Sequence, residues 1–262
     1  MLILGLAGHH GRVDVDSFAR DGFVVVRGAV DAGTAAACRD LIWRALAARG
    51  VRRPEPATWP SLARIDDLDD GPFAAAGLSP ALTAAYDELI GPGRWRSPVD
   101  VGRALMVRFP APDRAGAGYH IEASYPGPGG RGWVNVRSLA RGLLALFLLT
   151  DVGPDDAPTR LVCGSHLTVA RFLAPYGEAG TDADAELWYP STLCRPVAHA
   201  TGRAGDVFLC HPFIAATATW PHRGAGPRMI AQPAAPAAGF ALDGSDPSPV
   251  ARAIVSGLAT DE

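Results

Sequence analysis

The chain has 262 residues, which is enough for one large domain with a full hydrophobic core. Apolar residues make up 48% of it and charged residues 19%, as in ordinary globular proteins. A formal charge of −3 gives no reason to expect a nucleic-acid or acidic-membrane partner, and no apolar run approaches the length of a membrane span. The four cysteines lack CxxC spacing, so we expect reduced thiols and a cytoplasmic location.

The first third of the chain predicts helices around one strand. Ala, Leu and Arg at helical spacing favour a helix over 31–49, which Gly50 ends. Another helix over 80–90 starts with a proline and is followed by Gly91-Pro92. Prolines at 54, 56 and 60 make 51–72 loop-like. A short helix is expected over 15–19, with Asp14 or Asp16 as its cap.

From residue 104 the pattern changes from helical to extended. The apolar run over 143–150 is typical of a strand buried on both faces. A helix and a polar loop are expected over 167–190. Strands are expected over 23–27, 104–109, 120–122, 133–137, 143–150, 159–162, 207–211 and 228–232. Helices followed by short strands predict an α+β or mainly β barrel in a single domain, 1–262, with its core over about 14–232 and a loose tail over 233–262.

His120 and Glu122 are the first candidate site residues. Residues i and i+2 of a strand point to the same side, so this pair can grip one metal ion. A histidine and a carboxylate, completed by a distant second histidine, form the facial triad of non-haem Fe(II) oxygenases.

Four stretches of the chain carry a family resemblance: residues 18–26, 119–122, 148–167 and 205–228. They resemble, in order, the opening "F..dGfvvv", the HxD, the "LtDv…GptrvvpGSHl" segment and the "GDv…H…R" close of the phytanoyl-CoA dioxygenase family. The resemblance implies a double-stranded β-helix (jelly-roll, cupin-like) core with N-terminal and flanking helices. It also implies Fe(II) and 2-oxoglutarate as cofactors and a small-molecule substrate, and it specifies no oligomeric state.

The resemblance also implies roles for individual residues. His120 matches the family's first metal ligand, and Glu122 stands where the family has Asp. Arg228 matches the arginine that pairs with the distal carboxylate of 2-oxoglutarate, a role that suits its planar fork.

The chain departs from the family at the distal metal histidine, whose register falls on Ala216. An alanine cannot ligate iron. His211 lies five residues earlier, with the opposite strand parity, and is expected to be a hydrogen-bonded core or rim residue. His222 is the substitute third ligand that we consider, folded back by the proline-bearing loop before it. His166, in Gly-Ser-His, is expected to be structural.

A substrate pocket is expected beside this site. Its candidate apolar lining residues are Tyr119, Tyr125, Trp133 and Trp220, although aromatic residues at such positions are as often simple core. Arg137 is a candidate for binding a second carboxylate or an acidic group of the substrate.

Three functions follow from these residues. The first is an Fe(II)/2-oxoglutarate oxygenase that hydroxylates, desaturates or oxidatively cyclises a small secondary-metabolite-like substrate. The second is a metal-independent descendant, in which His120 and Glu122 serve as acid and base in an isomerisation, cyclisation or elimination. The third is a non-catalytic ligand-binding protein, because fold alone does not determine function.

Overall fold

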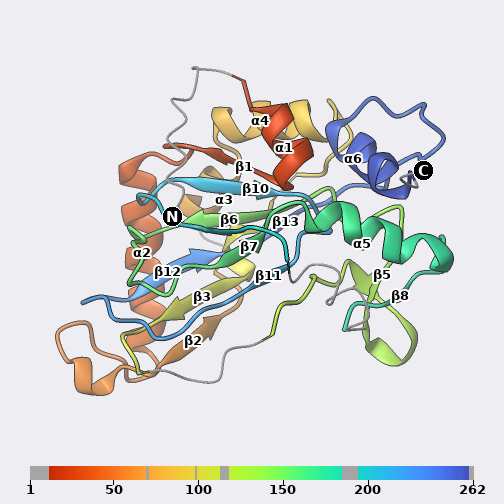
Figure 1. The fold of residues 1–262 in the computed structure, drawn as a ribbon. Coiled ribbons are helices and arrows are strands. Elements are labelled where there is room, and N and C mark those ends of the chain that lie inside the picture. Colours follow the sequence, from red (N-terminus) through yellow and green to blue (C-terminus); the bar gives the residue numbers. More distant parts are fainter. Residues whose placement is uncertain (1–11, 69–70, 98, 113–117, 185–193, 260–262) are drawn as a thin grey trace.

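The computed structural model describes residues 12–68, 71–97, 99–112, 118–184 and 194–259 (Figure 1). The α-helices are α1 (Val15–Asp21), α2 (Ala32–Ala47), α3 (Gly71–Gly77), α4 (Pro80–Leu89), α5 (Ser165–Leu173) and α6 (Pro249–Leu258). Single 3-10 turns are η1 (Pro56–Thr58), η2 (Val101–Arg103), η3 (Pro128–Gly130) and η4 (Ala174–Tyr176). Within these ranges no helix has both the length and the apolar character needed to cross a bilayer.

The strands are β1 (Phe23–Val26), β2 (Leu62–Ile65), β3 (Leu105–Arg108), β4 (Tyr125–Pro126), β5 (Gly132–Val134), β6 (Leu143–Leu148), β7 (Arg160–Val162), β8 (Thr181–Asp182), β9 (Val197–His199), β10 (Val207–Cys210), β11 (Ala216–Thr217), β12 (Arg228–Ala231) and β13 (Ala234–Ala235). They form an antiparallel main sheet in the order β1-β10-β6-β12-β3-β2, with β13 also pairing β6. Two smaller antiparallel sheets have the orders β11-β7-β9 and β4-β5-β8. The expected mixture of helices and antiparallel strands is therefore confirmed.

The first two helices begin where their capping residues predict. The carboxylate of Asp14 accepts a hydrogen bond from the backbone N–H of Ser17 and caps α1. Asp31 caps α2 in the same way through Thr34. Gly22 ends α1 in the left-handed conformation, with φ of 85°, and turns the chain into β1.

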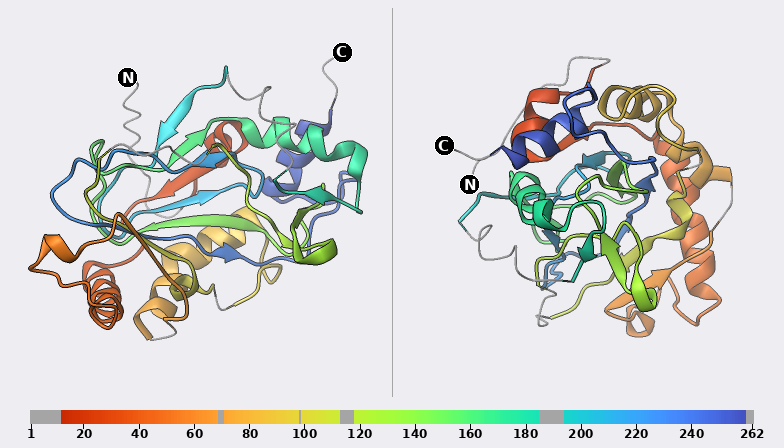
Figure 2. Two further views of the ribbon diagram at one scale, coloured as in Figure 1. Left: turned by 90° about the horizontal axis from the view of Figure 1, so that it is seen from below. Right: turned by 90° about the vertical axis from the view of Figure 1, so that its right-hand side faces the viewer.

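Alternate residues of the main sheet face two different hydrophobic clusters, as the period of two requires. The large cluster joins one face of the sheet to α2 and α4, and it includes Leu105, Val107, Ala145, Phe147, Val207 and Leu209. The small cluster joins the other face to β7, and it includes Leu146, Leu148, Leu161, Phe208, Cys210, Ile214 and Ile230. Figure 2 shows α2, α3 and α4 on one side of the main sheet and the β11-β7-β9 sheet on the other. The small cluster therefore lies between two facing sheets.

Three sequence expectations are corrected by the structure. Residues 120–122, expected to be a strand, contain only the isolated bridge of His120 with Ala216. Residues 51–72, expected to be loop, contain β2, which pairs with β3 along the edge of the main sheet. The tail, expected to be loose, contains β13 and α6. Val250, Ala251 and Ile254 of α6 are fully buried. A Cβ on Gly257 would meet the carbonyl oxygen of Leu167 at 2.7 Å, so α6 lies tightly against α5.

A pair of buried histidines holds these helices to the sheet. His211 Nε2 lies 3.3 Å from the carbonyl oxygen of Val250, and its Nδ1 accepts the N–H of Phe213. The ring of His166 stacks 4.9 Å from that of His211, and His166 Nε2 lies 3.2 Å from the carbonyl oxygen of Ala19. Both side chains are fully buried, so the structural interpretation of these two residues is confirmed.

The buried histidine pair predicts acid sensitivity of the fold. Burial lowers the pKa of His166 from 6.5 to about 4. Between these two values the unfolded chain binds a proton that the folded chain does not, so stability falls as the pH falls from 6.5 towards 4. We expect this effect of His166 to lower the free energy of unfolding by about 2 kcal/mol between pH 7.5 and pH 5. Urea unfolding at the two pH values measures this drop, which should shrink in His166→Gln; an equal drop in that variant would contradict the prediction.

Candidate active site

Ala216 lies directly opposite His120. The two residues form an antiparallel bridge in which each backbone N–H donates to the other's carbonyl oxygen, both at 3.0 Å. Side chains of such a pair lie on the same side of the two strands. The side chain of Ala216 packs against the small cluster, so His120 is directed towards the space between the two facing sheets. A methyl group, with no metal donor, stands next to the imidazole.

Glu122 lies beside His120. Their Nε2 and Oε1 atoms are 3.4 Å apart, and the two side chains are 43% and 48% exposed. His120 Nδ1 lies 3.3 Å from the carbonyl oxygen of Gly118. The Glu122 carboxylate raises the pKa of His120 above 6.5, and His120 lowers the pKa of Glu122 below 4.5. The pairing therefore favours an imidazolium beside a carboxylate, that is, an acid beside a base.

Arg141 adds a positive charge to this site. Its charge, with that of Arg64, helps to hold the pKa of Glu122 low. Burial lowers the pKa of Arg141 to about 10, and its Nε and Nη1 atoms have no hydrogen-bond partner among the described residues. Sequence reasoning missed Arg141, because an arginine in a turn before a strand gives no local sign of which side chain it faces.

The residues present do not fit a three-residue iron site. Within the described ranges, no three His, Cys, Asp or Glu side chains are placed to hold a metal ion. His222, the expected third ligand, is therefore not brought together with His120 and Glu122. It forms a bridge with Ala111, and its Nδ1 lies 3.9 Å from Oδ1 of Asp156.

Arg228 is buried on the face of β12 that looks into the space between the sheets. It is two residues from Ile230 of the small cluster, and only 2% of it is exposed. Its Nη1 donates to the carbonyl oxygen of Ala157, and burial lowers its pKa to about 9. Directly opposite it on β3 lies Arg108, which sequence reasoning missed. The sequence signal that could have found Arg108 is the alternation of side chains along β3, which puts Arg108 on the same face of the sheet as Met106.

The aromatic pocket candidates are divided between three places. Tyr119 packs against the large cluster, which also contains Ile121. Tyr125 and Trp133 are cross-strand partners in the β4-β5-β8 sheet, where the Trp133 indole N–H donates to the carbonyl oxygen of Ala179. The Trp220 ring lies 4.6 Å from the guanidinium carbon of Arg108. Trp220 is thus the candidate nearest to the buried arginines.

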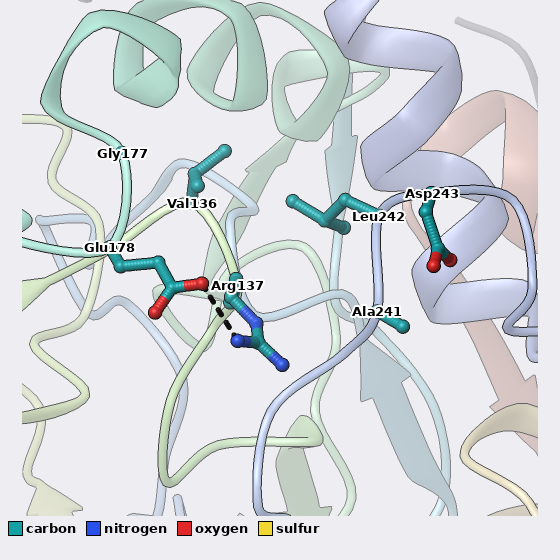
Figure 3. A pocket seen from close by; sticks show the side chains of 7 residues that line it. All are labelled: Val136, Arg137, Gly177, Glu178, Ala241, Leu242 and Asp243. Carbon is teal, nitrogen blue, oxygen red and sulfur yellow. Dashed lines mark hydrogen bonds and ion pairs between the residues drawn. The ribbon is translucent and has the colours of Figure 1, made fainter.

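Arg137 lines a separate surface depression of about 300 Å³ (Figure 3). Its Nη1 donates to Oε1 of Glu178 at 2.8 Å, and its Nε donates to the carbonyl oxygen of Phe240. Figure 3 shows that Val136 and Leu242 also line this depression, above the Arg137 guanidinium in the view. The guanidinium already has a carboxylate partner, so its role as a substrate-binding residue stays a prediction.

Comparison with known proteins shows the fold. No family model matches the chain, and no curated protein sequence matches it. The epimerase SnoN, solved with Fe3+, α-ketoglutarate and nogalamycin RO, is 21% identical with a TM-score of 0.56, over 84% of this chain and 80% of SnoN. HygX from Streptomyces hygroscopicus, solved with nickel and 2-oxoglutarate, is 20% identical with a TM-score of 0.53, over 82% and 83%.

The carbocyclase SnoK, a non-haem α-ketoglutarate-dependent enzyme from nogalamycin biosynthesis, is 17% identical with a TM-score of 0.51, over 85% of this chain and 82% of SnoK. At these identities the likeness concerns the fold alone. The chain has the fold of SnoN, HygX and SnoK.

The charge pairing of His120 with Glu122 gives a testable pKa. Two-dimensional 1H–13C NMR of the imidazole, assigned with His120→Ala, should show a pKa above 6.5 in the wild type. Glu122→Gln removes the carboxylate that raises it, so the pKa of His120 should fall. Glu122→Asp, which keeps a carboxylate, serves as the control. An unchanged pKa in Glu122→Gln would show that the two groups are not coupled.

Proposed function

We propose that this protein is an enzyme that transfers protons on a small, carboxylate-bearing molecule, with His120 as the acid and Glu122 as the base. The observation that carries this proposal is the position of Ala216 opposite His120, where the family resemblance implies a metal-binding histidine. One imidazole and one carboxylate are a poor chelate for iron, but they are a complete acid–base pair.

The states of the two groups suit this chemistry. Glu122 is ionised near neutral pH and can take a proton from a carbon or hydroxyl of the substrate. The His120 imidazolium can donate a proton to the atom that becomes negative. Both side chains are about half exposed, so water can return each group to its starting protonation state after turnover. An isomerisation, cyclisation or elimination needs no more than this.

Arg228 supports the choice of a carboxylate-bearing substrate. It is a buried cation on the wall of the same space, and its Nε has no partner among the residues described. A guanidinium binds a carboxylate through two parallel hydrogen bonds. In the family that the chain resembles, the matching arginine holds 2-oxoglutarate. SnoN was solved with nogalamycin RO and HygX with hygromycin B, which supports a secondary-metabolite-like substrate.

The resemblance also supports a finer description of the fold. We propose that the main sheet and the β11-β7-β9 sheet are the two walls of a double-stranded β-helix of the phytanoyl-CoA dioxygenase type. The four motif stretches and the small cluster between the facing sheets support this description.

A second candidate function is the Fe(II)/2-oxoglutarate oxygenase. The separation of 3.4 Å between donor atoms of His120 and Glu122 favours it, since two donors so close can share an ion. SnoN and HygX were solved with Fe3+ and nickel, respectively. Iron and 2-oxoglutarate together would supply oxidation by O2. The donor set described above lacks the third ligand, so we derive no step through iron.

Anaerobic Fe(II) titration with and without 2-oxoglutarate separates these functions. We expect no stoichiometric charge-transfer band in the wild type. Ala216→His places a second imidazole beside His120, so this variant should bind Fe(II) at least about 10–100-fold more tightly, the factor that even an outer-shell partner contributes. The matched control Thr217→His changes the neighbouring residue, whose side chain points to the other side of the strand.

A wild-type band that disappears in His120→Ala would contradict the acid–base proposal and establish the oxygenase, and its loss in His222→Ala as well would identify a relocated third ligand. Activity that survives a chelator and the absence of O2, and is lost in His120→Ala, supports the proposal. Ligand binding without turnover, unchanged in His120→Ala, would instead identify a binding protein.

A further inference from the structure

The turn that carries Arg141 is held by buried hydrogen bonds. The side-chain oxygen of Asn135 accepts the N–H of Leu139 at 3.1 Å, and the hydroxyl of Ser138 donates to the carbonyl oxygen of Arg141 at 2.8 Å. The Arg141 N–H in turn donates to the carbonyl oxygen of Ser138. Asn135 and Ser138 are both buried, so the turn is fixed from inside the protein.

Two residues of this turn adopt a backbone conformation that residues other than glycine rarely occupy. Ser138 has a φ of 50° and Ala140 a φ of 68°, both in the left-handed region. Such a conformation costs free energy, persists only where the surrounding contacts enforce it, and is common at functional sites. The chain therefore accepts backbone strain directly before Arg141.

The same turn starts beside the segment that carries the acid–base pair. The Ser124 N–H donates to the carbonyl oxygen of Trp133 at 2.7 Å, and Tyr125 pairs with Trp133. These contacts join the segment of Glu122 to β5, and the turn begins directly after β5 ends. The charge of Arg141 accordingly acts on Glu122.

The polar side chains of the segment share one side. Ile121 and Ala123 pack against the large cluster, and the residues that alternate with them are directed away from it. These residues are His120, Glu122 and Ser124. The acid, the base and the Ser124 hydroxyl therefore face the same space.

Arg141 and Ser124 have hydrogen-bonding groups that the protein leaves unused. Arg141 Nε and Nη1 are buried and have no partner among the described residues, and the same is true of Ser124 Oγ. Within those residues, neither an ion pair nor a hydrogen bond joins Arg141 to Glu122. Buried polar groups are normally paired, so unpaired ones near an acid–base pair indicate that a ligand supplies the partner.

We propose that Arg141 is a third catalytic residue, which donates hydrogen bonds to the carbonyl oxygen of a substrate whose neighbouring carbon loses a proton to Glu122. The substrate class is then a ketone, or another carbonyl compound with a C–H bond next to the carbonyl group. This inference rests on the proposed function and names the kind of molecule on which it acts.

The proton transfers balance without an oxidant. As the C–H bond breaks, an O–H bond forms on Glu122, and the electron pair moves to the carbonyl oxygen and gives an enolate. The Arg141 donors stabilise that negative oxygen. The His120 imidazolium then gives its proton to carbon, which restores the carbonyl group in an isomer of the substrate. The proton on Glu122 returns to His120 across the 3.4 Å between the two groups.

Hydrogen exchange in D2O with EDTA tests this role. The probes are pyruvate and 4-oxopentanoate, each labelled with 13C at the ketone carbon, and 1H NMR follows deuterium entering the positions next to the ketone. We expect the wild type to catalyse exchange in at least one probe. Arg141→Met should lose this rate by about 100–1000-fold, the usual effect of removing one oxyanion donor. Arg141→Lys keeps the charge and a donor and should recover part of the rate.

Two controls separate a substrate contact from a structural role. Arg141→Met removes a buried guanidinium and keeps an unbranched apolar side chain, so we expect it to fold with an unchanged or higher Tm. Arg52→Met changes an exposed arginine paired with Glu55 and should keep the exchange rate. If Arg141 acted only by keeping Glu122 ionised, a higher pH would restore the rate of Arg141→Met. We expect the loss to persist at every pH.

The 13C chemical shift of the bound ketone carbon reports the hydrogen bond independently of proton transfer. We expect a downfield shift in the wild type and in Glu122→Gln, and none in Arg141→Met. A shift without exchange would support the contact of Arg141 with the carbonyl group and contradict the proton transfer of the proposed function.

Three results would overturn the role of Arg141. Neither probe shows exchange or a 13C shift in the wild type, Arg141→Met keeps the full rate of an exchange that Glu122→Gln abolishes, or a higher pH restores the rate of Arg141→Met. The second and third results would leave the acid–base function standing.

Discussion

Two arginine side chains buried next to each other are the constraint on which the interior of this protein depends. Side chains along each strand of the main sheet point alternately to its two faces. Arg108 and Arg228 are therefore directed into the space between the facing sheets. Most of that face is apolar, as Leu146, Phe208 and Ile230 show. Arg108 and Arg228 interrupt it with charge that no described carboxylate pairs. A fold does not hold uncompensated charge in its interior without cost.

The His120 site faces the same space from the other sheet. The bridge to Ala216 places the imidazole on the side of β11 that packs against the small cluster. His120 and Glu122 thus lie beside β11, and Arg108 and Arg228 lie on the facing main sheet. The fold is that of SnoN, HygX and SnoK, and Ala216 stands opposite His120.

Local sequence patterns predicted much of the fold. They missed α6 and β2, two elements that contacts with distant parts of the chain stabilise. Capping carboxylates and apolar spacing placed α1, α2 and α4, and the run over 143–150 placed β6 at the centre of the main sheet. The α6 helix was missed because its segment follows a stretch rich in Ala, Pro and Gly. Short helices are marginal on their own, and α6 is stabilised by its contacts with α5 and with His211. Likewise β2 was missed because prolines at 54, 56 and 60 precede it, and it pairs with β3.

By itself, the sequence determined which candidate groups lie close together along the chain. The spacing of two between His120 and Glu122 made them neighbours, and the motif register pointed to Ala216 as the position without a donor. Only the tertiary structure decided what lies across the strands: Ala216 opposite His120, Arg108 opposite Arg228, and His222 beside Asp156 and not beside Glu122. The physical reason is that alternation along a strand is a local property of the backbone. The partner of each residue depends on sheet register, which is set by hydrophobic burial between segments far apart in the chain.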